Sequence, residues 1–558
     1  MQKKEAKQAY SQIETELNRR SFVKNSLLAM AAAGTLSSGA LASVASKTSG
    51  KAGGKADEFD VIVVGGGSGG AVVASRLSEN PQLRVLLIEA GPTFSAEHFP
   101  PVLAKREMVG GGDYVWEKQA STGTDHTNQH LRAKVLGGGS AINAAAFVRA
   151  PKFDFDRWTQ QGLKGWSYEE VLPYFKRMES ANYGADAYHG RNGPMPVRLP
   201  RLDHLSPASQ AFYHASVAHG LRANDDINGA DPSGVAIYPV NVVDGIRMNT
   251  AMTYLRPEVR QRSNLEILGN RMVDKVLLEN KRVVGVQLSD GGRLNAANVF
   301  LCAGSAGSPA ILMRSGVGPA DDLKALDIPL VIDLPVGRNL HEQPTNGILV
   351  SCDPKLGTYP PIGTTLWARS SIAEAGELDI FISNNHFVNP ELFPTKAGFQ
   401  LFFAVGRPYA RGNLKLASRD PLATPRIDLN LLGDERDLLR MIELCKLSRE
   451  ILAEAPLKAI SKGEVPRSLG GKVALSESEI REEQKSTVMT NLHLSSTAPM
   501  GMESDPFAVL DAHGKVLGLE GLYVSDASVF PDVPSQATNP DVIMAAEYLS
   551  ALFINKRA

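Results

Sequence analysis

Residues 58–77 read EFDVIVVGGGSGGAVVASRL, and this stretch decides the fold. Its first part, residues 58–64, is an apolar run rich in β-branched residues and short enough for a buried parallel strand. Its last part, residues 71–77, reads as a helix, and a helix N-terminus offers free N–H groups and a partial positive charge to phosphates. The segment therefore predicts a strand–turn–helix unit that opens a nucleotide-binding domain.

The turn between this strand and this helix fits the pattern G-x-G-x-x-G. In that pattern the first glycine permits a tight turn, the second lets the backbone approach a pyrophosphate, and the third allows close packing of helix and strand. The cofactor-binding residues predicted from the turn are Gly65, Gly67, Ser68, Gly69 and Gly70.

A second apolar run, residues 84–88, ends in Glu89, which lies 19 residues after Gly70. An acidic side chain at this distance accepts hydrogen bonds from an adenosine ribose, so Glu89 is a further candidate cofactor ligand. The acid argues for a free ribose hydroxyl and against a ribose 2′-phosphate. These features predict a Rossmann-like α/β domain, and they leave FAD and NAD as alternatives.

Length and composition set limits on the other classes. The chain has 558 residues, too many for one compact core, so two or more domains are expected. With 59 Lys+Arg against 60 Asp+Glu it has no global field to attract nucleic acid. Three widely spaced cysteines exclude a disulfide scaffold and a CxxC-type metal site, and we predict no metal.

The amino-terminal region has the features of a targeting signal. Residues 18–24 are NRRSFVK, followed to about residue 45 by a mildly apolar run of Ala, Ser and Gly that ends in small residues. Paired arginines before such a run resemble a twin-arginine export signal, here residues 1–45. The alternatives are a weak membrane anchor or a disordered tail. Export predicts a periplasmic or secreted protein, with residues 46–57 as a linker.

Beyond the amino-terminal region, no stretch reaches 18 consecutive apolar residues, so we predict no transmembrane segment in the mature chain. Twin-arginine export moves proteins that are already folded. An exported protein with a tightly held cytoplasmic cofactor needs that route, which raises the expectation of a bound cofactor.

Three later motifs distinguish the cofactors. They read RAKVLGGGSAINAAAFVR at 132–149, FLCAGSAGSPAILMRSGVG at 300–318 and LYVSDASVFPDVPSQATNPDVIMAAE at 522–547. With these blocks in order, the chain resembles the glucose–methanol–choline (GMC) oxidoreductases, mostly FAD-dependent alcohol oxidases and dehydrogenases. The resemblance implies FAD, in a Rossmann-like domain joined to an α+β substrate domain with an antiparallel sheet.

The resemblance also implies how the chain is divided between the two domains. The FAD-binding domain is expected to be discontinuous, and the substrate-binding domain is expected to fill the intervals. The FAD-binding parts are 58–157, 241–340 and 489–558, and the substrate-binding parts are 158–240 and 341–488.

The motifs carry further candidate cofactor ligands by resemblance. In the family, the Gly/Ser-rich turn of the first motif runs beside the flavin ring and pyrophosphate, a hairpin contacts adenine, and a strand-end pair contacts the flavin near its pyrophosphate. The matching residues here are Gly137, Ser140 and Asn143 in the turn, the backbone of Val273 in the hairpin, and Asp526 and Ala527 at the strand end.

Two positions of the first motif depart from the family in informative ways. Gly139 stands where a Ser or Cys is usual. Some relatives carry a His at the position of Ile142 and bond FAD covalently through it. Because isoleucine cannot form that bond, the resemblance implies non-covalent FAD.

The candidate catalytic base is His493, in the segment NLHLSSTAPMG at 491–501. Removing an alcohol proton as hydride leaves requires a base, and an imidazole titrates near neutral pH. His493 matches the catalytic histidine of the family, although Ser495, Ser496 and Ala498 replace the usual neighbours.

The second catalytic candidate is Asn539, eight residues before Glu547, where the family has His or Asn. Its amide offers a donor and an acceptor to hold the substrate oxygen. The alternative role is an N-cap, because Pro540 and a helical stretch over 541–553 follow it. In the implied reaction His493 takes the hydroxyl proton and the hydride passes to the flavin N5.

The predicted function is oxidation of a CH–OH group in an alcohol, a sugar or a similar small molecule. The electron acceptor is oxygen or a separate quinone or cytochrome chain, since the sequence has no haem CxxCH motif and no iron–sulfur cysteines. One alternative is a lyase of the same family that keeps the flavin and cleaves cyanohydrins without net redox. The other is a silent FAD-binding protein, which the pair His493 and Asn539 argues against.

Overall fold

A computed structural model describes residues 58–117, 119–123, 126–467, 471–474 and 476–556. Residues Phe59–Ala558 form one unit by their internal contacts. The export signal predicted at 1–45 and the linker predicted at 46–57 lie outside the described residues.

The first sheet has a parallel core that contains the predicted nucleotide-binding strand. Strand β1 (Glu58–Val64) pairs in parallel with β2 (Val85–Ile88), and β2 pairs in parallel with β11 (Leu265–Leu268). The four residues of β2 are all buried, as expected for a parallel strand covered on both faces. This arrangement confirms the Rossmann-like part of the predicted fold.

The same sheet continues on the other side of β1 with strands from distant parts of the chain. The order is β11-β2-β1-β14-β13-β12, and β23 pairs in parallel with β14. The bounds are Arg293–Leu301 for β14, Arg282–Leu288 for β13, Val273–Glu279 for β12 and Leu522–Val524 for β23. Strands β12 and β13 form the antiparallel hairpin that the resemblance implies around Val273.

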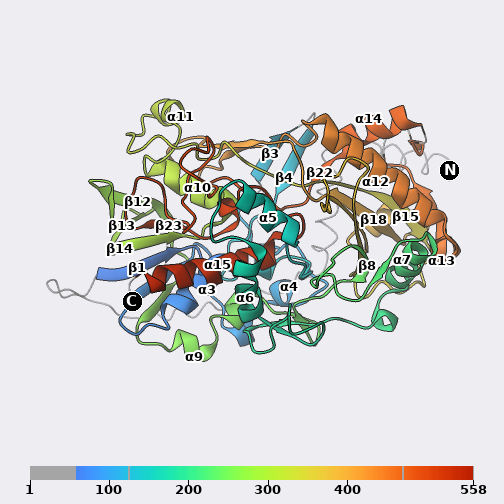
Figure 1. Ribbon diagram of the computed structural model, residues 1–558, viewed down its shortest axis with the longest axis horizontal. Helices are drawn as coiled ribbons and strands as arrows, with labels where there is room; N and C mark the ends of the chain where they lie inside the picture. Colours follow the sequence, from blue (N-terminus) through green and yellow to red (C-terminus); the bar gives the residue numbers. More distant parts are fainter. Residues whose placement is uncertain (1–57, 118, 124–125, 468–470, 475, 557–558) are drawn as a thin grey trace, which may run out of the picture. The chain divides into compact units, whose positions relative to one another are not determined.

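Three helices begin at the edge of this sheet where the site lies: α3 (Ser68–Leu77), α10 (Gly304–Arg314) and α15 (Thr538–Asn555). Helix α15 lies beside α3 and also packs against α6 (Tyr168–Met178) (Figure 1). The buried carboxylate of Glu547 on α15 accepts hydrogen bonds from the Arg76 guanidinium of α3, each at 2.7 Å, and from the Tyr254 hydroxyl at 2.8 Å. This buried ion pair ties the last helix to the first.

The second sheet is mainly antiparallel, as the resemblance predicts. Its order is β21-β15-β18-β17-β16-β8-β7, with β22 paired to β15. The bounds are Ser461–Val465, Pro344–Cys352, Gly398–Val405, Ile380–Asn385, Ile362–Ala368, Gly234–Ile237 and Ala223–Asn224 in that order, and Met489–Thr490 for β22. Helices α7 (Pro207–Ala218) and α12 (Glu435–Ala453) pack on the sheet, and α13 (Ala455–Ile460) packs against α7.

A smaller sheet joins β19 (Asn413–Lys415), β20 (Arg426–Asp428), β3 (Gln119–Gly123) and β4 (His126–His130). The remaining α-helices are α4 (Pro101–Ala104), α5 (Lys152–Gln160), α8 (Thr250–Thr253), α9 (Pro257–Arg260), α11 (Ala320–Lys324) and α14 (Glu477–Thr487), and short 3-10 helices lie between some of the elements. Two short strand pairs complete the described structure, β5 (Glu179–Ala181) with β6 (Met195–Val197) and β9 (Val242–Val243) with β10 (Ile246–Arg247).

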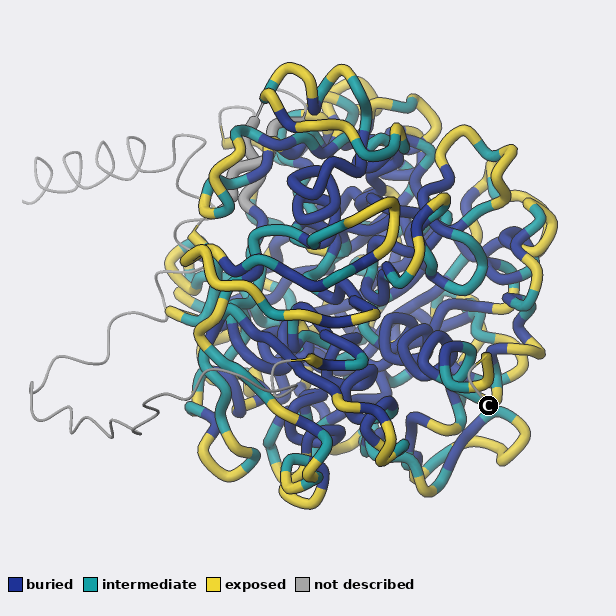
Figure 2. Tube along the Cα trace, turned by 90° about the vertical axis from the view of Figure 1, so that its left-hand side faces the viewer, coloured by how far each residue is buried: buried dark blue, intermediate teal, exposed yellow. Residues whose placement is uncertain are grey.

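Buried residues fill the interior, and the exposed residues gather at the periphery (Figure 2). Most buried apolar side chains belong to one continuous core, and a second cluster that includes Trp367 and Phe381 lies on one face of the antiparallel sheet. A search of the described residues finds no helix with the length and hydropathy needed to cross a membrane.

Candidate active site

The glycine turn after β1 is shaped by close backbone approaches. Gly65 has φ +95°, and a Cβ on it would lie 2.5 Å from the carbonyl oxygen of Cys302 at the end of β14. A Cβ on Gly70 would lie 1.9 Å from the carbonyl oxygen of Gly65, which is why a helix can begin directly against the strand. Any side chain at these two positions would separate β1, β14 and α3.

The N-terminus of α3 is suited to an anion. Its N-cap is Gly67, no side chain caps it, and its first turn contains no acidic residue. The helix begins at Ser68, three residues earlier than predicted, so Ser68 and Gly69 lie in its first turn. The uncapped N–H groups and the helix dipole together favour a phosphate at this point.

Glu89 stands at the carboxyl end of β2 with its carboxylate fixed. One oxygen accepts a 2.8 Å hydrogen bond from the backbone N–H of Gly66, and the other accepts one of 2.8 Å from Gly91. Burial raises the pKa of this carboxyl, and the backbone donors act against the rise. The backbone N–H of Ala90 also acts on this carboxyl, and a carboxylate can accept about four hydrogen bonds, so capacity remains for a ribose hydroxyl.

Val273 is brought to the same end of the sheet. The chain crosses the end of β2 just before it, because the N–H of Arg271 donates to the carbonyl oxygen of Glu89 at 3.0 Å. Val273 is buried and begins β12 two residues later. Val273 thus follows, two residues later, the point where the chain is bonded to the backbone of Glu89.

The second glycine-rich segment packs directly against the first. A Cβ on Gly138 would lie 2.5 Å from Cα of Gly67, so the two backbones touch. The hydroxyl of Ser140 is used inside the segment, where it donates to the carbonyl oxygen of Gly137 at 2.6 Å and accepts from the N–H of Thr250 at 3.0 Å. Ser140 therefore shapes the turn.

Three other residues of this segment, Asn143, Gly139 and Ile142, differ in their surroundings. Oδ1 of Asn143 accepts a 3.0 Å hydrogen bond from the N–H of Ala145. A Cβ on Gly139 would meet no protein atom within 4 Å, so this position faces open space. Ile142 is buried and carries no group able to form a covalent link to a cofactor.

The carboxylate of Asp526 is fully used in local contacts. One oxygen accepts from the N–H of Gly304 at 2.9 Å and from the hydroxyl of Ser308 at 2.5 Å, and the other accepts from the N–H and the hydroxyl of Ser528. The side chain thus ties the start of α10 to the short helix Ala527–Val529. Any cofactor contact at Asp526 and Ala527 must therefore come from their backbone atoms.

The side chain of His493 is half-buried, and only its Nδ1 is hydrogen-bonded to described residues. Its Nδ1 lies 2.7 Å from Oε1 of Gln343 and 3.0 Å from Nδ2 of Asn491, and its backbone N–H donates to Oε1 of Glu342 at 2.9 Å. No described residue forms a hydrogen bond with Nε2. One ring nitrogen is therefore anchored, and the other remains available to a substrate.

The pKa of His493 differs from the sequence-based expectation. Burial first, and then the charge of Arg132, lower it to about 4, whereas an unperturbed imidazole titrates near neutral pH. The imidazole is consequently neutral at pH 7, which is the form that accepts a proton.

Asn539 lies in the first turn of α15, whose N-cap is Ala537 with no side-chain cap bond. The N-cap role considered for Asn539 is therefore not the one it has. Its Oδ1 accepts a 2.7 Å hydrogen bond from the hydroxyl of Ser68, and its buried Nδ2 has no partner among the described residues. A buried amide donor without a partner is unfavourable, and it marks a point where a ligand atom fits.

Both catalytic candidates are tied to the nucleotide-binding end of the first sheet. Asn539 is bonded to Ser68 at the start of α3. The segment of His493 is tied to the start of α10, because the hydroxyl of Ser305 donates to the carbonyl oxygen of Leu494 and the carbonyl oxygen of Ser305 accepts from the Thr497 hydroxyl at 2.7 Å. The carboxyl ends of parallel strands are where open α/β sheets bind ligands.

Three residues of this site were missed from the sequence: Arg132, Glu342 and Gln343. A guanidinium nitrogen of Arg132 lies 3.4 Å from the carbonyl oxygen of Leu492, next to the candidate base. Burial raises the pKa of Glu342 to about 7. Arg132 is the first residue of the glycine-rich motif at 132–149, whereas no motif in the sequence marks Glu342 or Gln343.

The backbone around the base is strained. Leu492 and Ser496 have φ of +63° and +64°, in the left-handed region that side chains other than glycine disfavour. Such residues gather at sites where geometry is constrained by function. The strain accompanies the replacement of the family's usual residues noted at 495, 496 and 498.

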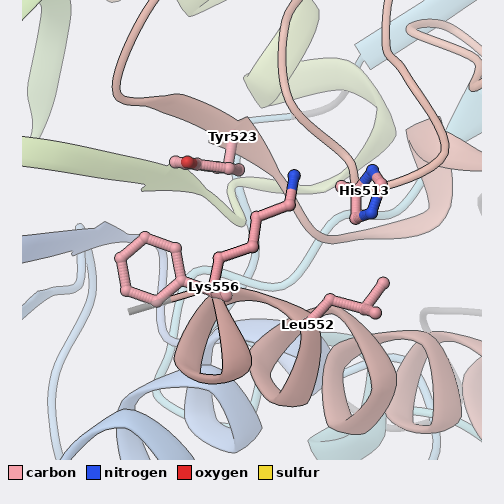
Figure 3. Close-up of a pocket in the computed structure, with 5 residues that line it drawn as sticks. His513, Tyr523, Leu552 and Lys556 are labelled. Carbon is pink, nitrogen blue, oxygen red and sulfur yellow. The ribbon is translucent and has the colours of Figure 1, made fainter. Parts of the chain in front are cut away.

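A separate surface pocket lies at the end of α15. It is lined by His513, Tyr523, Leu552, Phe553 and Lys556, and the Lys556 side chain extends between Tyr523 and His513 (Figure 3). It contains none of the predicted site residues. A search of the described residues finds no group of three or more His, Cys, Asp or Glu that could hold a metal ion.

A helix start suited to a diphosphate, with a neutral imidazole and an unpaired amide donor at the same end of the sheet, fits the class of dinucleotide-dependent oxidoreductases. The family is shown by its sequence model, GMC oxidoreductase, whose two parts match residues 59–345 and 408–546. The chain belongs to the GMC oxidoreductase family, a family of flavoproteins, which confirms the resemblance seen in the motifs.

Several relatives share the whole length of the fold. The chain is 32% identical over 524 residues to the oxygen-dependent choline dehydrogenase of Photobacterium profundum, covering 88% of this chain and 92% of that protein. It is 34% identical over 533 residues to the mitochondrial choline dehydrogenase of Mus musculus, covering 88% of each.

Solved structures show the same fold. Pyridoxine 4-oxidase from Mesorbium loti superposes with a TM-score of 0.82 at 30% identity, covering 89% of this chain and 99% of that one. A fungal aryl-alcohol oxidase superposes with a TM-score of 0.77 at 21% identity, covering 90% and 99%, and this likeness concerns the fold alone.

Proposed function

We propose that this protein binds FAD without a covalent link and oxidises a CH–OH group of a small alcohol-type substrate. His493 is the base that takes the hydroxyl proton, and Asn539 holds the substrate oxygen through Nδ2. The observation that carries the proposal is the unpaired, buried Nδ2 of Asn539 at the same end of the sheet as a neutral imidazole.

The residues present fit FAD. The uncapped start of α3 suits a diphosphate, the fixed carboxylate of Glu89 suits a ribose, and the backbone contact between Gly67 and Gly138 leaves no side chain in the way. The open space at Gly139 lies on the segment that the family places beside the flavin ring. Ile142 supports the non-covalent state, because it offers no nucleophile.

Bound FAD would supply the hydride acceptor, N5 of its ring. The protein contributes position and charge. Nε2 of His493 removes the proton from the substrate hydroxyl, so that an alkoxide forms. Nδ2 of Asn539 donates a hydrogen bond to that oxygen, which is worth more to the charged form than to the neutral alcohol.

The substrate class is supported by the relatives. Relatives at 30% identity or more include proteins named for choline, a primary alcohol, and for pyridoxine, which carries hydroxymethyl groups. We propose a primary alcohol for this chain. The electron acceptor is either oxygen or a separate quinone or cytochrome chain, and stopped-flow reoxidation of the reduced protein by each acceptor decides between them.

The test uses purified, flavin-loaded protein under anaerobic conditions. Bleaching of the flavin absorbance is followed with a panel of primary alcohols, and the His493→Ala variant is expected to bind flavin normally while reducing it on the order of 10²–10⁴-fold more slowly. His513→Ala, in the surface pocket, is the control. Unchanged rates in His493→Ala, or cyanohydrin cleavage without bleaching in the unmodified protein, would refute the proposal.

We also propose that residues 1–45 direct twin-arginine export and that the mature protein is periplasmic or secreted. The support is the pair Arg19 and Arg20 before a weak apolar run. Replacing both with lysine should retain the full-length precursor in the cytoplasm, and fractionation with immunoblotting checks this. Equal export of the variant would refute it.

The domain division stays a proposal as well. It is supported by the strands of the first sheet, all of which come from 58–157, 241–340 and 489–558. Strand β22 (Met489–Thr490) falls at the boundary and pairs with the second sheet. Limited proteolysis of the flavin-loaded protein with mass spectrometry tests whether cleavage points follow these limits.

A further inference from the structure

Gln343 is fully buried between the candidate base and two loops, and every hydrogen-bonding position of its amide is filled. Its Oε1 accepts from Nδ2 of Asn491 at 2.7 Å and lies 2.7 Å from Nδ1 of His493. A carbonyl oxygen has two lone pairs, so these two neighbours use its whole accepting capacity.

The nitrogen of the same amide is equally committed. Nε2 of Gln343 donates to the carbonyl oxygens of Gly406 at 2.8 Å and Pro534 at 2.9 Å, and it lies 3.4 Å from that of Gln536. Carbonyl oxygens only accept. The amide therefore cannot turn over, because its oxygen would then face three acceptors and its NH2 group would face the Asn491 donor.

A fixed Oε1 has a consequence for the ring of His493. At 2.7 Å from an atom that only accepts, Nδ1 must carry the hydrogen. A neutral imidazole has one N–H, so Nε2 is then the bare nitrogen. Nδ2 of Asn491 also lies 3.0 Å from Nδ1, but it already has an acceptor in the same Oε1 at 2.7 Å, so the contact between the two nitrogens does not require a bare Nδ1.

We infer that Gln343 is a positioning residue that selects the Nδ1–H tautomer of His493 and so keeps Nε2 free to accept the substrate proton. The inference rests on the proposed function of His493 as base. During the reaction the O–H bond of the substrate breaks and an Nε2–H bond forms, while Nδ1–H continues to donate to Gln343. The other charged groups that face this ring are Arg132 and Glu342.

The same amide connects both halves of the site. Pro534 and Gln536 belong to the loop that leads into α15, five and three residues before Asn539. Gly406 supports this loop from the antiparallel sheet, since a Cβ on it would lie 2.4 Å from the carbonyl oxygen of Ser535. Gln343 thus holds the segment of the substrate-orienting amide with its nitrogen and the base with its oxygen.

The test compares two substitutions that distinguish a role at the base from a purely structural role. Gln343→Leu and Gln343→Glu both lose the donors to Gly406 and Pro534, and the second Glu oxygen would face these acceptors, so loop support alone predicts at least as much damage in Gln343→Glu as in Gln343→Leu. In Gln343→Leu the Asn491 amide becomes the remaining neighbour of Nδ1 and donates to it, which favours Nε2–H and blocks the base. In Gln343→Glu an oxygen still accepts from Nδ1–H.

Flavin-loaded protein with 15N-labelled histidine gives the direct readout. In the unmodified protein the His493 signal, assigned by its loss in His493→Gln, should show a protonated Nδ1 and a bare Nε2. Gln343→Leu should exchange the two states and slow anaerobic flavin reduction about 10²-fold or more. Gln343→Glu should retain the tautomer, reduce flavin faster than Gln343→Leu, and shift its pH–rate profile to higher pH.

Two further variants act as controls. Gln484→Leu removes another buried amide, one that bonds Asn346 at 2.9 Å, and should leave the tautomer and the reduction rate unchanged. Adding Asn491→Leu to Gln343→Leu should recover part of the rate, because the donor that blocks the base is gone.

A protonated Nε2 in the unmodified protein overturns the inference, and so do equal rates in Gln343→Leu and Gln343→Glu. If Gln343→Leu does not fold, the spectrum of the unmodified protein and the profile of Gln343→Glu decide. If no alcohol reduces the flavin at all, the proposed function fails, while the tautomer measurement still confirms or overturns the role of Gln343.

Discussion

The hydroxyl of Ser68, in the first turn of α3, donates a 2.7 Å hydrogen bond to Oδ1 of Asn539, in the first turn of α15. The two residues are 471 positions apart in the chain. Because Oδ1 is occupied, the amide of Asn539 is oriented with its NH2 group directed away from Ser68. Its donor is thus available to a ligand before any ligand arrives.

Asn539→Asp should therefore slow flavin reduction with little loss of folding stability. The change replaces the free Nδ2 donor by an oxygen of similar size and removes a hydrogen bond to a charged oxygen, worth about 1.5–3 kcal/mol, or about 10- to 150-fold in rate. Anaerobic stopped-flow reduction measures it. Ser68→Ala keeps the Nδ2 donor of Asn539 but removes the hydrogen bond that orients it, so it should lower the reduction rate less. Equal losses of rate in the two variants would contradict the role of Nδ2 as the donor to the substrate.

Stability should fall on acidification, and His341 should account for part of the loss. This buried imidazole has its pKa lowered to about 3, by burial first and then by the charge of Arg411, against 6.5 for the unfolded chain. Between pH 6.5 and pH 3, His341 is therefore protonated in the unfolded state and neutral in the folded state. The stabilisation is fully present above pH 6.5 and is lost as the pH falls towards 3.

The measurement is urea unfolding of unmodified protein and His341→Phe at pH 7 and pH 5. Between these values the histidine should account for about 2 kcal/mol of the fall in the free energy of unfolding, and the variant should fall correspondingly less. His98→Phe, on the surface, is the control. An identical pH dependence in both proteins would show that His341 plays no part.

Asp532→Asn should destabilise the protein by about 3–5 kcal/mol, because it removes one partner of a buried ion pair. The carboxylate accepts from the Arg157 guanidinium at 2.7 and 2.8 Å and from Nε1 of Trp158 at 2.6 Å, and Arg157 holds its pKa well below the usual range despite its burial.

The matched control is Asp203→Asn, which breaks the exposed pair with Arg201 and should leave the free energy of unfolding nearly unchanged. Chemical denaturation followed by tryptophan fluorescence compares them. Asp532 belongs to the loop that carries Pro534 and Gln536, so its variant should also lower the reduction rate. A loss of stability no larger than that of Asp203→Asn would show that the pair is not important.

Adjacent glycines in the second motif should respond differently to alanine. Gly138→Ala places a Cβ 2.5 Å from Cα of Gly67 at a φ of +52°, so it should lower both thermal stability and flavin content. Gly139→Ala meets no protein atom within 4 Å and should leave the melting temperature unchanged or slightly raised. Differential scanning fluorimetry and flavin absorbance check both variants. Equal damage at both positions would contradict the backbone contact between the two glycine segments.

The sequence was sufficient wherever local pattern and local structure coincide. Strand β1, the glycine turn and Glu89 lie where the spacing predicted them, because one strand–turn–helix unit carries all the information. The hairpin of β12 and β13 was located by the resemblance to the family, and its two strands lie next to each other in the chain.

The parts that were missed depend on contacts between distant segments. The donors and acceptors of Gln343 lie 63 to 193 residues away, so nothing next to it in the sequence marks its role. Helix α15 begins at Thr538, so Asn539 is a helical residue and not the N-cap that its sequence neighbours suggested. The pKa of His493 is set by burial, which spacing cannot supply.

The pairing of the first helix with the last has a consequence during synthesis. A ribosome releases α3 early, but the partner of Ser68 and the carbonyl oxygen of Ser525 that backs Gly69 are translated hundreds of codons later. A nascent chain therefore carries an incomplete nucleotide crevice until its final helix emerges. Cofactor capture should follow chain completion, so that flavin loading reports on finished molecules and truncated products remain colourless.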